Sequence, residues 1–243
     1  MHCVCTRGSR MAETSLAFDT LRSLLSERYS CRAFLPVPLA RGLIERVLDA
    51  AQRTASWCNA QPWQVYIASG PRLERLRTAL LAAASDAPAP DLSWPRAYNG
   101  IYRERRRECA MGLYAAVGIA EGDRAASARQ ANENFRLFGA PHLVIVTADE
   151  ALGTYGAIDC GAYVANFLTA AQALGIAAIP QAAVAAHPAV LRAHLAIPQE
   201  RRIVCGISFG MADASHPANG FRTARAPVSD CVVWVGEGDE EGS

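Results

Sequence analysis

The chain has 243 residues, 51% of them hydrophobic, and its 24 basic and 23 acidic side chains give a net charge of +1. This length and apolar content are sufficient for one large core, and the balanced charge gives no general attraction to nucleic acid or to a membrane surface. No apolar run is long enough to span a bilayer. The eight cysteines are dispersed without a CxxC pair, a pattern typical of reduced thiols in a cytoplasmic protein and not of a metal site.

Both ends of the chain are predicted to lie outside the folded domain. Residues 1–14 contain no apolar segment typical of a signal peptide, and we expect them to form a disordered extension, with Met11 as an alternative start. Residues 237–243 are acidic and are also expected to be disordered. A single domain over residues 15–236 remains.

Apolar residues at helical spacing, with Gly-Pro and polar interruptions between them, predict most of the helices. In chain order, the predicted helices are a first segment from Leu16 to the residues before Arg28, then residues 39–53, 73–81, a run entered at 98–108, 123–138, 156–174 and 189–195. Segments rich in β-branched and aromatic residues predict strands at residues 63–69, 142–147, 176–179, 202–209 and 231–235. Helices outnumber strands without strict alternation, which favours an α+β fold around one central sheet.

Two of these segments indicate an assembly of more than one chain. The helix at residues 156–174 is apolar on nearly all sides, which is typical of a helix buried at a subunit interface. The strand at residues 231–235 would present an apolar edge unless it pairs with a sheet. We therefore expect a homodimer.

Two short motifs carry the functional interpretation. The first runs from Arg28 to Phe34 and reads Arg-Tyr-Ser-Cys-Arg-Ala-Phe; in an extended chain Arg28 and Arg32 point the same way. The second is the loop from Thr54 to Trp63, where Pro62 stiffens the connection between a helix and a strand. Taken alone, this loop is equally compatible with an ordinary helix-to-strand connection.

Together the two motifs resemble the nitroreductase family of flavin enzymes, which has Arg-x-Ser-x-Arg-x-Phe near its start and Asn-x-Gln-Pro-Trp after the next helix. The resemblance implies a mainly antiparallel sheet flanked by helices, and a homodimer with FMN at the interface between residues of both chains. It also implies a ping-pong reaction, in which NAD(P)H reduces the flavin and the flavin reduces a nitroaromatic, quinone or similar small electron-poor acceptor.

The same resemblance assigns roles to individual residues. Arg28 would bind the FMN phosphate, Ser30 the phosphate or ribityl chain, and Arg32 the pyrimidine edge of the ring, while Asn59 would contact ring heteroatoms. Thr223 departs from the pattern, because several family members have lysine two residues before the arginine that Arg225 matches. The complete predicted cofactor set is Arg28, Tyr29, Ser30, Arg32, Ser56, Trp57, Asn59, Gln61, Pro180, Gln181, Ala182, Arg222 and Arg225.

Residues 98–108 form a basic and aromatic run that allows two interpretations. Tyr98 and Tyr102 are predicted to contact substrate as part of a lid, whereas four arginines within five residues are more typical of a solvated helix face. No side chain is predicted to be an obligatory acid or base, so water would supply protons.

Other functions remain as alternatives. Gly206–Gly210 matches the Gly-x-Ser-x-Gly elbow of hydrolases, but Asp213 and His216 follow too closely for that fold, so Ser208 is predicted to be structural. No Gly-x-Gly-x-x-Gly follows a predicted strand, which argues against a Rossmann nucleotide site. Another branch of the superfamily, such as a reductive dehalogenase or an ene-reductase, and a flavin-binding protein without turnover also fit the sequence.

Overall fold

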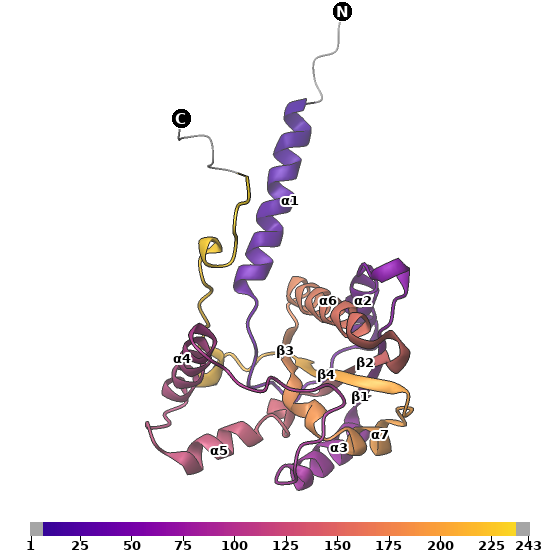
Figure 1. The fold of residues 1–243 in the computed structure, drawn as a ribbon, viewed down its shortest axis with the longest axis vertical. Coiled ribbons are helices and arrows are strands. Elements are labelled where there is room, and N and C mark those ends of the chain that lie inside the picture. The colour runs from indigo at the N-terminus through magenta and orange to yellow at the C-terminus, as the bar shows by residue number, and fades with distance from the viewer. Residues whose placement is uncertain (1–6, 237–243) are drawn as a thin grey trace, which may run out of the picture.

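The computed structural model describes residues 7–236, and its centre is one four-stranded sheet (Figure 1). The strand order is β1-β2-β4-β3, and every neighbouring pair is antiparallel. The strands are β1 (Gln64–Ser69), β2 (His142–Asp149), β3 (Ala177–Gln181) and β4 (Arg201–Gly210). The predicted α+β fold with an antiparallel sheet is confirmed.

Helices cover both faces of this sheet. In Figure 1, α2 and α6 lie on one face and α3 and α7 on the other, while α4 and α5 lie to one side and α1 projects away from the body. The helices are α1 (Arg7–Glu27), α2 (Arg41–Ala51), α3 (Gly70–Ala83), α4 (Ile101–Ala116), α5 (Arg124–Asn132), α6 (Gly153–Ala173) and α7 (Pro188–Leu195). In this part of the chain no helix is both long and apolar enough to cross a membrane.

Strand β2 shows why the sheet needs both helical layers. Its residues from His142 to Ala148 are all buried, and successive side chains of a strand point to opposite faces. Val144 and Val146 belong to the core cluster that includes residues of α2 and α6. Leu143 and Ile145 belong to the cluster with α3 and α7. An apolar strand without alternation is therefore stable here because both of its faces are covered.

The ends of the domain differ from the sequence prediction. Helix α1 begins at Arg7, so residues 7–14 belong to a helix in the structure, where the sequence predicted a disordered extension. Residues 1–6, with Cys3 and Cys5, and residues 237–243 lie outside the described part. Residues 231–235 do not form a strand, because they leave the body after a short turn at Val228–Asp230 and meet no strand edge within the chain. Strand composition alone does not supply a pairing partner.

Two helix predictions also need correction. Helix α5 ends at Asn132, short of the predicted 138. From Glu133 to Phe135 the backbone N–H groups bond three residues back instead of four, and Leu137 and Phe138 then take left-handed φ values of 57° and 52°. Helix α6 buries only one face: Tyr163 and Phe167 lie in the core, but Tyr155 is exposed. Burial on all sides, as predicted for this helix, is not reached within one chain.

Candidate functional site

The Arg28–Phe34 motif runs as an extended segment beside the sheet. Ser30 pairs with Ala178 of β3, and Phe34 pairs with Ala212 just after β4. The Cys31 N–H donates to the Ala178 carbonyl oxygen at 3.3 Å. Because this backbone is fixed, Arg28, Ser30 and Arg32 all line one cleft, while Cys31 is buried behind it.

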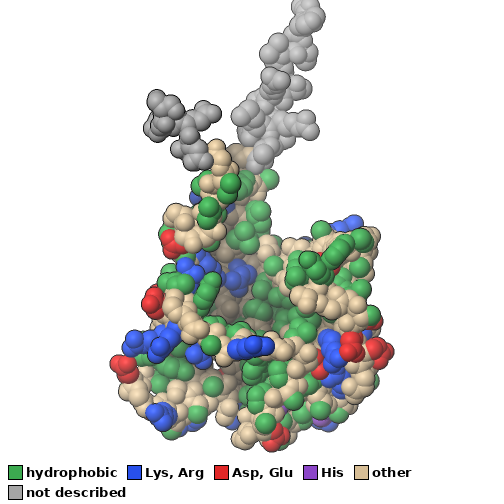
Figure 2. Space-filling view, viewed as in Figure 1, with side chains coloured by type: hydrophobic (Ala, Val, Ile, Leu, Met, Phe, Trp, Pro, Cys, Tyr) green, Lys and Arg blue, Asp and Glu red, His purple; other side chains and the backbone are tan. Residues whose placement is uncertain are grey.

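The cleft gathers four arginines from the two ends of the domain. It measures about 830 Å³ and lies between the end of α1, the Arg28 motif and the return segment, which we define as residues 219–225. Figure 2 shows arginine side chains within the hollow at the base of the projecting α1. The lining arginines are Arg28, Arg32, Arg222 and Arg225. None of the four forms an ion pair with a described carboxylate.

The cleft carries positive charge that no described carboxylate neutralises, so it is suited to bind an anion. Burial lowers the pKa of Arg28, and the positive charge of Arg225 lowers it further. Burial also lowers the pKa of Arg32. The Nη1 atom of Arg28 is buried without a hydrogen-bond partner among the described residues, which is costly for a charged group. The acidic residue of the lining, Glu27, accepts a hydrogen bond from the Ser23 hydroxyl at 2.6 Å.

The return segment holds its two arginines by contacts with its own chain. The Arg222 guanidinium lies 3.6 Å from the centroid of the Tyr29 ring, in the arrangement of a cation–π contact. Its Nη1 donates to the Asn219 carbonyl oxygen at 2.6 Å. Arg225 Nη1 donates to the Thr223 hydroxyl at 2.8 Å. Thr223 thus orients Arg225. By the resemblance stated above, several family members have lysine at the position of Thr223.

A second cavity continues from Ser30 and Arg32. It measures about 320 Å³ and is closed by Pro180–Ala182 on the sheet side and by residues of α4 and α5 on the other. The structure therefore brings the Pro180–Ala182 segment beside the Arg28 motif, as the sequence predicted. Gln130 and Asn134 supply amide groups to the same lining, and sequence reasoning missed them because they belong to no recognisable motif.

The side chains of Gln181 and Ser208 are hydrogen-bonded to each other, so their polar groups are already engaged within the protein. Gln181 is 3% exposed, and its Nε2 donates to the Asn134 carbonyl oxygen at 3.0 Å. Its Oε1 accepts a hydrogen bond from the Ser208 hydroxyl at 2.5 Å. Gln181 can therefore offer mainly its backbone to a ligand. Ser208 is fully buried, and its predicted structural role stays a prediction.

The Thr54–Trp63 loop has a conformation fixed by its neighbours. Cys58, Asn59 and Gln61 have left-handed φ values of 49°, 55° and 48°, which are uncommon for residues other than glycine. The Trp57 N–H donates to Asp159 of α6 at 3.1 Å, and the Gln61 N–H donates to the Ser56 hydroxyl oxygen at 2.9 Å. A loop that carries this much strain is held in place by the surrounding structure.

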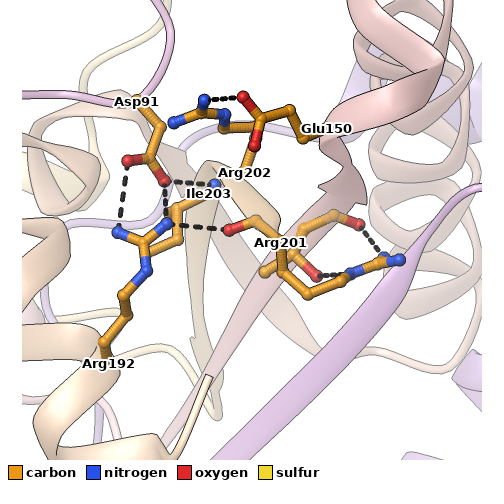
Figure 3. Close-up of polar contacts among 7 residues, drawn as sticks. Asp91, Glu150, Arg192, Arg201, Arg202 and Ile203 are labelled. Carbon is orange, nitrogen blue, oxygen red and sulfur yellow. Dashed lines mark hydrogen bonds and ion pairs between the residues drawn. The ribbon is translucent and has the colours of Figure 1, made fainter. Parts of the chain in front are cut away.

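A buried ion-pair network supports the far end of this loop (Figure 3). Arg192 makes a two-bond pair with Asp91, at 3.1 and 2.7 Å, and also donates to the Arg201 carbonyl oxygen. Arg201 in turn donates to the Pro62 carbonyl oxygen at 2.8 Å and to the Thr147 carbonyl oxygen at 2.9 Å. The network thereby joins residue 91, helix α7 and the start of β4 to the end of the loop.

The structure does not bring this loop together with the arginine cleft in one chain. Trp57 and Cys58 line a separate cavity of about 330 Å³ with Tyr155 and Asp159, which shares no lining residue with the arginine cleft. Ser56, Asn59 and Gln61 line none of the cavities described above. The predicted site therefore consists of two separated halves: the arginine cleft with Pro180–Ala182, and the Thr54–Trp63 loop.

The two predicted substrate tyrosines lie outside both halves. Tyr102 is 66% exposed, and Tyr98 lies beside Arg106, whose guanidinium is 5.2 Å from the tyrosine ring centroid. Arg105 and Arg107 are exposed and form pairs longer than 3.5 Å with acidic residues. Within one chain, the geometry matches the solvated helix face better than the lid. No cluster of three potential metal ligands occurs among residues 7–236.

Comparison with known proteins identifies the family. A model described as the nitroreductase family matches residues 25–211. The chain belongs to this family. It is similar to a 4-nitrobenzoate reductase from Pseudomonas putida, with 32% identity over 91% of this chain and 98% of the relative. It is also similar to nitroreductase NfnB from Mycolicibacterium smegmatis, with 34% identity over 85% of this chain and 89% of the relative.

The structural comparison agrees with the family. The crystal structure of the FMN-dependent nitroreductase NfnB from Mycobacterium smegmatis in complex with NADPH matches with a TM-score of 0.85 and 32% identity, over 90% of this chain and 99% of that one. The crystal structure of an FMN- and NADPH-dependent nitroreductase NfnB from sphigopyxis sp. strain HMH matches with a TM-score of 0.85 and 29% identity, over 89% of this chain and 99% of that one. The nitroreductase-like fold predicted from the two motifs is confirmed.

Proposed function

We propose that this protein is an FMN-dependent oxidoreductase that uses NAD(P)H to reduce nitroaromatics, quinones or similar electron-poor acceptors in the cytoplasm. The observation that carries the proposal is the arginine cleft, where the buried Nη1 atom of Arg28 has no hydrogen-bond partner among the described residues. A phosphate monoester fits this requirement, because its oxygens accept charge-assisted hydrogen bonds from guanidinium groups. The relatives named as FMN- and NADPH-dependent support the same cofactor and reductant.

In this proposal each part of the cleft has one task. Arg28 and Arg225 hold the phosphate, Ser30 donates a hydrogen bond to the phosphate or ribityl chain, and Arg32 provides positive charge at the pyrimidine edge. Pro180–Ala182 presents its backbone to the ring from the neighbouring cavity. Bound FMN would supply the hydride chemistry, and the protein would bind and orient it.

The cleft lining suggests that water supplies the protons. Glu27 is the acidic residue of that lining, and it already accepts the hydrogen bond from Ser23. Reductant and acceptor would occupy the same space in turn, which gives a ping-pong cycle.

We also propose that a second copy of the chain completes the site. One chain leaves large apolar side chains exposed on three elements: Phe18 of α1 at 64%, Trp57 of the loop at 58% and Tyr155 of α6 at 57%. The Trp57 and Tyr155 rings pack together, with centroids 4.3 Å apart. Exposed apolar surface of this kind marks an interface, and isologous dimers are the commonest assembly. The partner would place its own Thr54–Trp63 loop over the arginine cleft.

The C-terminal residues contribute to both chains in this arrangement. Arg222 and Arg225 lie in the cleft of their own chain, whereas Val233, Trp234 and Val235 beyond them are largely exposed. We propose that residues 228–236 pack against the partner. Truncation after Pro227 would then weaken the dimer but leave the four arginines in place.

The test of the proposed activity uses purified protein under anaerobic conditions. Extracted cofactor should be FMN, its absorbance near 450 nm should bleach with NAD(P)H, on the order of one reductant per flavin for a two-electron carrier, and a nitroarene should restore it. Bound FAD, or no flavin after reconstitution with FMN, would contradict the proposed cofactor. Bound FMN that NAD(P)H cannot reduce would instead identify a flavin-binding protein without turnover.

A further inference from the structure

Asn219 lies directly behind the arginine cleft and does not line it. It is 5% exposed and ends the short turn Pro217–Asn219. Its Oδ1 accepts a hydrogen bond from the Arg32 N–H at 2.7 Å. Its Nδ2 donates to the Ala33 and Asp213 carbonyl oxygens, both at 2.8 Å. Both amide hydrogens and one acceptor site of the side chain are therefore used.

The backbone of the same residue holds a second arginine. The Asn219 carbonyl oxygen accepts the hydrogen bond from Arg222 Nη1 at 2.6 Å. One residue thus fixes the main chain of Arg32 through its side chain and the guanidinium of Arg222 through its carbonyl. These two arginines line the same cleft, although Asn219 and Arg32 are 187 positions apart in the sequence.

A neutral amide suits this position for a physical reason. Arg28 and Arg32 are partly desolvated and the charge of Arg225 repels that of Arg28, so holding these cations together in the free protein costs free energy. A carboxylate at position 219 would pair with an arginine and compete with an incoming anion. An amide makes the same geometric connection and leaves the positive charge unneutralised.

The other side of the return segment is anchored by packing. The Phe221 ring lies against α4 at Gly112, where a Cβ atom would come within 2.5 Å of the Phe221 Cε2 atom. Arg222 is therefore held between the Asn219 connection and the Phe221 contact, with its guanidinium on the Tyr29 ring. The segment is fixed before any ligand binds.

We propose that Asn219 is a positioning residue that joins the return segment, which carries Arg222 and Arg225, to the Arg28–Phe34 motif and so pre-assembles the arginine cleft. This inference rests on the proposed binding of FMN and adds a residue that touches no part of the cofactor. Preorganisation of a binding site raises affinity by removing the ordering cost from the binding step. The benefit should fall on the phosphate end of the ligand, because the return segment carries Arg225, which we assign to the phosphate. The backbone beside Arg32 is held in addition by the hydrogen bond from the Cys31 N–H to the Ala178 carbonyl oxygen.

The experiment compares FMN with riboflavin, which lacks the phosphate. Apo-protein is titrated with each flavin by fluorescence quenching, for wild type and Asn219→Ala, at several salt concentrations. Asn219→Ala removes the side-chain bonds that anchor the return segment. We expect the FMN dissociation constant to rise about tenfold or more, in line with the loss of one charged hydrogen bond from Arg225 to the phosphate. Riboflavin affinity should change less than about twofold, and the FMN affinity of the variant should depend less steeply on salt because its cations are dispersed.

A matched control separates positioning from a general loss of stability. Asp91→Asn keeps the shape of another buried polar residue but removes the ion pair with Arg192 at the opposite end of β4. It should lower the melting temperature without changing the ratio of FMN to riboflavin affinities. If Asn219→Ala does not fold, Asn219→Ser gives the same readout with a smaller expected change in that ratio.

Each outcome has one meaning. An equal loss of FMN and riboflavin affinity, or an unchanged FMN affinity, would overturn the positioning role and leave Asn219 as a structural residue. A wild-type protein that binds both flavins equally would instead refute the phosphate assignment on which the proposed function rests. A selective loss of FMN affinity with salt dependence reduced confirms the inference.

Discussion

Replacing Arg28 with methionine should separate the stability of the free protein from its affinity for FMN. Methionine keeps an unbranched apolar stem and removes a cation that burial and Arg225 disfavour. We therefore expect the apo-protein to be at least as stable as wild type. A hydrogen bond to a charged group contributes about 1.5–3 kcal/mol, so the FMN dissociation constant should rise about 12- to 140-fold, since 1.4 kcal/mol is a factor of ten.

The assay is urea unfolding with and without FMN. At free FMN equal to about 100 times the wild-type dissociation constant, ligand binding adds about 2.7 kcal/mol to the wild-type free energy of unfolding, and the affinity loss predicts about 0.3–1.3 kcal/mol for Arg28→Met. Arg41→Met is the control, because Arg41 is exposed and pairs with Glu45 on α2. Equal stabilisation of Arg28→Met and wild type by FMN would refute the reasoning, as would an apo-protein destabilised by several kcal/mol.

Three further predictions test separate parts of the account. Arg32→Ala, with FMN still bound, should lower the flavin reduction potential in spectroelectrochemistry, because it removes positive charge from the reduced ring; an unchanged potential would place Arg32 elsewhere. Ser208→Ala should retain nearly full steady-state turnover, whereas loss of turnover with FMN bound would revive a nucleophilic role. Burial lowers the pKa of His142 below its usual value of 6.5, so as the pH falls the unfolded state binds a proton there before the folded state does, and the free energy of unfolding should fall below about pH 6.5. The urea midpoint of His142→Gln should fall less steeply with decreasing pH than that of wild type. Equal slopes for the two proteins would exclude this contribution.

The sequence predicted the parts of the fold that local patterns determine. Strand β2 was predicted because an unbroken run of branched apolar residues has few alternatives to burial on both faces. The segment at residues 231–235 has a similar composition, yet it pairs with nothing because the sheet edges lie elsewhere. The difference between these segments is a matter of tertiary neighbours, which propensity does not contain.

The candidate site was predictable where motifs are compact. Arg28, Ser30 and Arg32 lie within five residues, and the extended backbone alone directs them to one cleft. Their meeting with Arg225 depended on family resemblance, because no local pattern relates segments almost two hundred residues apart. Asn219 was missed for the same reason, since its role arises only from the backbone groups that surround it.

The separation of the site into two halves also escaped local reasoning. Asn59 lies on a loop pinned by Asp159 and Arg201, and these contacts place it away from the arginine cleft of its own chain. A single sequence does not show whether a loop contributes to the site of its own chain or to the site of a partner chain. The proposed dimer is therefore the part of the account that most needs a direct experiment.

Complementation between two inactive variants tests that central claim. Arg28→Ala damages the arginine cleft and Asn59→Ala damages the loop, so each homodimer should be impaired at both of its sites. A co-expressed heterodimer, purified with two different tags, would pair the intact cleft of the Asn59→Ala chain with the intact loop of the Arg28→Ala chain. We predict about one functional site per heterodimer, and hence about half of the wild-type FMN content and NAD(P)H-dependent turnover, as expected for isologous symmetry. A heterodimer as inactive as both parent variants would contradict a site shared between two chains.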